Sequence, residues 1–203
     1  VWNRKEKEAA VLEYNRGTLS EGLYLMYLGG LIVAVGLVAT LLLFMLPVLR
    51  VLSLVSAIAA LIGAIISVVG LYKMRHLHPD YMSALLLLGL QFVIKIVSRN
   101  QINFVVLDMI LILVSLVGLY FLIRATNFFL DLRGREDMVK MGNRVLFFNI
   151  ASSLVSSVLN MFIPKLVNSV EGLFGIIILL LVISLVVTWY QLSYMKKSAE
   201  ALR

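Results

Sequence analysis

Long apolar stretches with almost no charge are the feature of this sequence that most constrains its fold. Lipid offers no hydrogen-bonding partners to the backbone, so a segment that crosses the hydrocarbon core does so as a helix of roughly 20 apolar residues. With 62% hydrophobic and 14% charged residues, the composition is that of an integral membrane protein. The clearest candidate spans are 23–49, 51–72, 102–123 (with one charge, Asp108), 145–164 and 172–195.

A sixth candidate span, 81–98, is shorter, since its uncharged part ends at Ile94, before Lys95. Lys95 can extend it by reaching to the interface. Cytoplasmic segments hold the excess of Lys and Arg. Six spans place fourteen such residues on one side: Arg4, Lys5, Lys7, Arg16, Lys73, Arg75, Arg124, Arg133, Arg135, Lys140, Arg144, Lys196, Lys197 and Arg203. The other side holds four: Arg50, Lys95, Arg99 and Lys165. We therefore predict an all-α, six-transmembrane-helix bundle with both termini cytoplasmic, in a plasma membrane of bacterial type.

The sequence predicts two regions. Residues 1–21 contain four glutamates, unlike a signal peptide, and are expected to form a cytoplasmic helical segment. Residues 22–203 form the six-helix domain. Thr18-Leu19-Ser20-Glu21 has the spacing of a capping box at the start of the first span, and residues 168–171 have a similar pattern before the last. Pro79 is expected in the first turn of the third helix.

The cytoplasmic loop 124–144 mixes aromatic and charged residues. It predicts an extension of the fourth helix, a turn at Gly134 and an interfacial helix that leads into the fifth span. A docking surface for a partner is the alternative.

The six spans pair into three hairpins that resemble one another. The second helix of each ends in a similar pair of residues, Leu71-Tyr72, Leu119-Tyr120 and Trp189-Tyr190. This pattern is typical of an internal repeat of helical hairpins. Aromatic residues also gather at membrane interfaces without any repeat, so both interpretations stay open.

Polar residues inside apolar spans are the candidate functional residues, because burying them in lipid is costly. Gln91, Lys95 and Asp108 flank the turn at residues 99–101 and predict a polar pocket for a solute, or alternatively an ion pair that stabilises the hairpin. Asn149 and Asn160 lie with four serines along the fifth span and could line a hydrated path, or bond to neighbouring helices.

Small residues recur at steps of three and four along the second span. They are Ser53, Ser56, Ala57, Ala60, Gly63, Ala64, Ser67 and Gly70. Small side chains let helix backbones approach closely in lipid, so Ala60, Gly63, Ala64 and Ser67 are predicted packing residues. Gly29, Gly30 and Gly36 of the first span are candidate partners.

The sequence carries few features of an enzyme. It has no cysteine and lacks the metalloprotease, nucleophile-elbow and phosphate-loop motifs. His76, His78 and Asp80 would need a further group to hold a metal, and a turn before Pro79 explains them. We therefore expect no catalytic residue, no metal and no cofactor. The net charge of +7 is accounted for by topology and by anionic lipid at the cytoplasmic face, so no nucleic acid is expected.

The leading expectation is a non-enzymatic accessory, scaffold or oligomer-forming membrane subunit, with a second copy or another membrane protein as partner. The alternative is a small-solute transporter or substrate-binding membrane subunit with a polar pocket near Gln91, Lys95 and Asp108. In size and helix count the chain resembles the substrate-binding subunits of energy-coupling-factor vitamin transporters.

Overall fold

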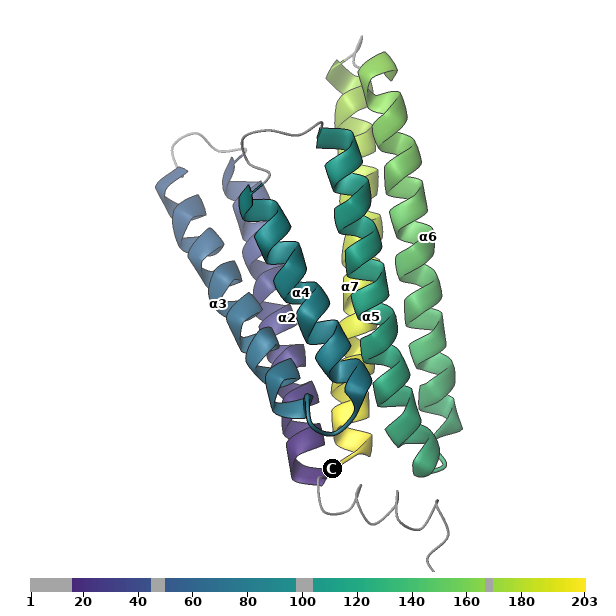
Figure 1. The fold of residues 1–203 in the computed structure, drawn as a ribbon. Helices are drawn as coiled ribbons and strands as arrows, with labels where there is room; N and C mark the ends of the chain where they lie inside the picture. The colour runs from purple at the N-terminus through teal and green to yellow at the C-terminus, as the bar shows by residue number, and fades with distance from the viewer. Residues whose placement is uncertain (1–15, 45–49, 98–103, 167–169) are drawn as a thin grey trace, which may run out of the picture.

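Six helices account for all the regular structure in the part of the chain that the structure, a computed structural model, describes: residues 16–44, 50–97, 104–166 and 170–203. In chain order they are α2 (Arg16–Phe44), α3 (Arg50–Met74), α4 (Pro79–Val97), α5 (Phe104–Leu132), α6 (Glu136–Leu166) and α7 (Val170–Ala201). Each helix packs on the next, and α2 also packs on α7, which closes a ring of six helices (Figure 1).

Four helices are long and apolar enough to cross a membrane within the described residues. These segments are Arg16–Ala39, Leu54–Met74, Met109–Leu132 and Ile178–Ala201. The described parts of α4 and α6 are not among these segments. The four apolar helices fit a membrane-embedded protein, whereas six crossings and the side on which the termini lie stay predictions.

The buried core is concentrated at one end of the bundle, which we call the base. The base contains Arg16, the turn at residues 75–78, the turn around Gly134 and the C-terminus (Figure 1). Fully buried side chains there include Leu23, Met74, Tyr81, Leu130 and Tyr194, from five helices. Toward the opposite end α4 and α5 diverge (Figure 1), and many large apolar side chains of the helices are exposed, as expected for surfaces that contact lipid.

The helix ends agree only partly with the sequence prediction. Pro79 is the first residue of α4, and Gly134 adopts the left-handed conformation (φ 67°) in the turn between α5 and α6, so both predictions are confirmed. The helix start predicted at Thr18 is wrong, because α2 is already helical at Arg16 and continues without a break. Its Ser20 hydroxyl does not cap the helix but donates to the carbonyl oxygen of Ala199 (2.9 Å).

The predicted interfacial helix is also absent as a separate element. The residues after Gly134 form the first turns of α6, which is continuous from Glu136 to Leu166. The cap predicted at residues 168–171 lies mostly outside the described residues. The hairpins α2–α3, α4–α5 and α6–α7 are present as packed pairs, while their repetition stays a prediction.

Small residues bring α2 and α3 into close contact along most of their length. Gly22, Gly29 and Gly36 follow a seven-residue spacing and face Gly70, Gly63 and Ser56 in antiparallel order. A Cβ on Gly22 would lie 2.9 Å from the carbonyl oxygen of Gly70, and one on Gly36 would lie 2.9 Å from that of Ser56. Larger side chains would therefore force the two backbones apart.

Candidate functional site: a central cavity closed at the base

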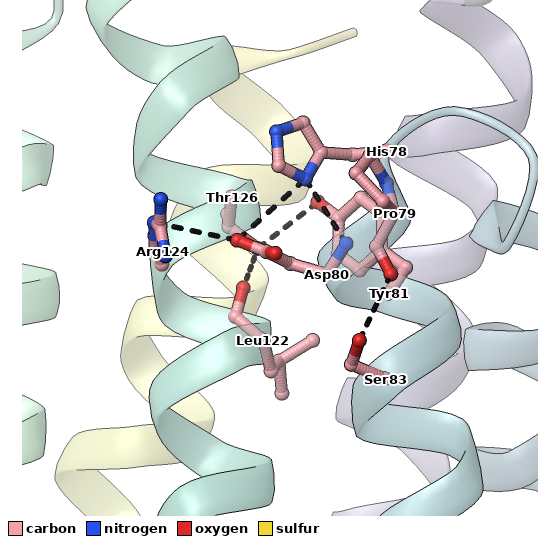
Figure 2. A network of polar contacts seen from close by, with 8 residues as sticks. All are labelled: His78, Pro79, Asp80, Tyr81, Ser83, Leu122, Arg124 and Thr126. Carbon is pink, nitrogen blue, oxygen red and sulfur yellow. Dashed lines mark hydrogen bonds and ion pairs between the residues drawn. The ribbon is translucent and has the colours of Figure 1, made fainter.

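A polar network crosses the base and closes the interior of the bundle at that end. Tyr81 of α4 and Thr126 of α5 share a hydrogen bond (3.1 Å), and the Thr126 hydroxyl also lies 2.9 Å from the carbonyl oxygen of Leu122 (Figure 2). Tyr194 of α7 donates to the side-chain oxygen of Asn127 (2.8 Å). These bonds join three helices through side chains that are buried or half-buried, so the base is held by specific contacts.

An ion pair lies beside this network. The Asp80 carboxylate is 3.4 Å from Arg124 Nε, and its Oδ2 is 3.7 Å from His78 Nδ1 (Figure 2). His78 Nδ1 accepts a hydrogen bond from the backbone N–H of Asp80 (3.2 Å), which caps the first turn of α4. Arg124 supplies a positive charge next to Asp80.

Within the residues that the structure describes, no three His, Cys, Asp or Glu side chains gather closely enough to hold a metal ion. His78 instead packs against Phe128, with ring centroids 5.2 Å apart. Helix capping and packing therefore account for this histidine, as the sequence predicted for the turn.

Beyond the base, the ring of helices lines a partly open cavity of about 860 Å³. All six described helices contribute to its wall, which consists mainly of Leu, Val, Ala and Met side chains. The described polar side chains in the wall are Ser67, Gln91, Ser115, Ser156, Ser184, Thr188 and Gln191. The described wall contains no charged residue, so the cavity suits a molecule that is mostly apolar with a few hydrogen-bonding groups.

Of the predicted ligand-binding residues, Gln91 lines this cavity. Lys95 and Asp108 lie on α4 and α5 near the opposite end, but their side chains fall outside the described part of the structure, as does that of Asn160. Asn149 is not in the described cavity wall, and its amide donates to the carbonyl oxygen of Val145 on the same helix (2.9 Å).

The predicted packing residues lie on the α3 face described above. Gly63 and Ser67 contact Gly29, and the Cβ of Ala60 lies 3.1 Å from where a Cβ on Gly36 would be. Ala64 is half-buried on the same helix. Gly30, in contrast, faces Leu192 of α7 and not α3.

Sequence reasoning missed the polar residues that α7 contributes to the cavity. Ser184, Thr188 and Gln191 follow the i, i+4, i+7 spacing of one helical face, and all three line the cavity. That spacing within an otherwise apolar span was the signal that could have identified them.

The chain matches none of the protein-family models, none of the curated proteins and none of the solved structures with which it was compared. The likeness in size and helix count to vitamin-transporter subunits thus gains no support from a shared fold.

Proposed function

We propose that this protein binds a small, mostly apolar molecule in its central cavity and acts as a substrate-binding membrane subunit or a small-solute transporter. The cavity is the observation that supports this proposal. Its volume of about 860 Å³ falls within the range of about 300 to 1,000 Å³ that is typical of small-molecule sites. Gln91 and Gln191 offer amide groups that can orient a bound molecule.

Lys95 and Asp108 remain part of this proposal as groups near the end of the cavity that is remote from the base. They lie close to the ends of α4 and α5 that flank residues 98–103.

The accessory or oligomer-forming role stays a second proposal, with less support. Its support was the small-residue face of α3, which can pack within the subunit or between subunits. Gly63 and Ser67 of that face pack on α2 of the same chain, which favours packing within the subunit at these residues. That the protein is not an enzyme also stays a prediction.

The test is native mass spectrometry of the protein purified in mild detergent. We expect one retained small molecule per chain, and its loss in Ser115→Phe, because Ser115 lines the cavity and the larger ring occupies it. Val117→Phe is the matched control: Val117 lies two residues away on α5, is 43% exposed and is not in the cavity wall. No retained molecule in wild type, together with discrete oligomers or a bound protein, would favour the accessory role instead.

A further inference from the structure

The seam between α2 and α7 is closed near the base and open farther along. Near the base, Ser20 bonds to the carbonyl of Ala199, and a Cβ on Gly30 would lie 2.7 Å from a methyl carbon of Leu192. Beyond that point a second hollow of about 360 Å³ lies between the two helices. Close packing therefore ends at about the level of Gly30.

This hollow, which we call the seam groove, adjoins the central cavity. Five residues line both: Ala34, Val38, Leu185, Thr188 and Leu192. These five side chains border both spaces. On its outer side the groove is bordered by Val35 and Trp189, which are 61% and 69% exposed on surfaces of membrane-spanning segments. The cavity thus has a route toward the lipid that surrounds the bundle.

The chemistry along this route is that of lipid. The described walls of the groove and of the cavity contain no charged side chain. A charged or strongly hydrated solute would lose its water there without gaining an ionic partner, which is costly. Two amides are the exception: no hydrogen bond joins the side chain of Gln91 or Gln191 to another residue in the described part of the chain. Both remain available to an ester or hydroxyl group.

We propose that the occupant of the cavity is an acyl chain of a membrane lipid, which reaches the cavity laterally through the seam groove between α2 and α7. This inference rests on the proposed binding function and specifies its ligand. Ala34 controls the route, because its small side chain borders both spaces at the place where they meet.

The test uses tryptophan fluorescence of the full chain in bilayers of phosphatidylcholine with brominated acyl chains, which quench tryptophan on contact. The two native tryptophans, Trp2 and Trp189, are replaced by Phe. A single tryptophan is then introduced as Val114→Trp, in the cavity wall, or as Leu113→Trp, which is 61% exposed and outside the wall. We expect brominated lipid to quench both, and aqueous acrylamide to leave Val114→Trp unaffected.

Closing the route tests the lateral path. Adding Ala34→Phe should abolish quenching by brominated lipid at Val114→Trp and leave it unchanged at Leu113→Trp. Ala57→Phe, on an exposed part of α3 away from both spaces, is the control and should change neither. If Val114→Trp does not fold, Ser184→Trp reports on the same cavity from α7.

Three outcomes would overturn the inference. Quenching of Val114→Trp by acrylamide and not by brominated lipid would show that the cavity contains water. Quenching by neither would show that acyl chains do not enter the cavity. Quenching that persists in Ala34→Phe would exclude the seam groove as the path. In each case, a non-lipid molecule retained in native mass spectrometry would still support the proposed binding function. If no molecule is retained, both the binding function and the acyl-chain inference are wrong.

Discussion

Gly29 and Gly89 are helix-interior glycines with opposite surroundings. A Cβ on Gly29 would meet the backbone carbonyl of Gly63 and lie 2.6 Å from the backbone nitrogen of Ser67, whereas nothing lies within 4 Å of a Cβ on Gly89. Gly29→Ala should lower the free energy of unfolding by about 1–3 kcal/mol, because backbone cannot move aside cheaply. Gly89→Ala should raise it by about 0.5–1 kcal/mol through helix propensity.

Thermal unfolding of both glycine variants in the same detergent measures these two effects. Equal shifts of the same sign would contradict the close approach of α2 and α3, since helix propensity alone acts alike at both positions.

The hydroxyl of Tyr194 should contribute measurably to the stability of the base. Tyr194→Phe removes its bond to Asn127 and leaves a half-buried amide oxygen with one partner fewer, which costs about 1–3 kcal/mol. Tyr24→Phe is the control, because Tyr24 is 47% exposed and its change should stay within about 0.5 kcal/mol. Chemical unfolding followed by circular dichroism compares the two, and equal values would show that the network at the base does not stabilise the fold.

At the scale of single residues, the sequence predicted packing better than the polar site. Small residues at regular steps identify a close helix contact, and the structure places Gly63 and Ser67 in one. The wall of the cavity, by contrast, depends on how six helices are rotated about their axes. Gln191 lies in that wall and Asn149 does not, although both are amides in apolar spans.

At the scale of helices, the turn between α5 and α6 requires a residue that tolerates positive φ. Gly134 has φ 67°, which costs most residues about 1–2 kcal/mol. Gly134→Ala should lower the unfolding free energy by about 1 kcal/mol, whereas Gly134→Asn should cost less, because Asn adopts this conformation more readily. Unfolding curves of the two variants provide the measurement, and a more damaging Asn than Ala would contradict the assigned turn.

Helix positions were predictable because apolar runs and turn residues are local signals. Pro79 begins α4 and Gly134 follows the end of α5 for reasons contained in each residue's own backbone preferences. The predicted start at Thr18 is wrong because α2 is already helical at Arg16. Ser20 bonds to the distant Ala199, a contact that no local pattern indicates.

For the whole molecule, the Lys and Arg residues near the base predict a cytoplasmic base. The chain has no cysteine, so one introduced cysteine gives a unique label site. In intact cells, Arg203→Cys should resist a membrane-impermeant maleimide until lysis, while Ser169→Cys, between α6 and α7, should react at once. The reverse pattern would mean that the base lies outside the cell. Equal reactivity of both cysteines in intact cells would mean that they lie on the same side, which contradicts a crossing by α7, the helix between them.

The arrangement of contacts in the ring also determines how the molecule can move. Glycine and serine residues hold α2 against α3 from Gly22–Gly70 to Gly36–Ser56, whereas the described close contacts of α2 with α7, from Ser20 to Gly30, lie in the half of α2 nearer the base. Any widening of the ring at its far end would therefore carry α2 and α3 together as one rigid arm. The two helices would rotate together about their contacts at the base. The angle of that rotation would determine the largest ligand that fits inside the ring.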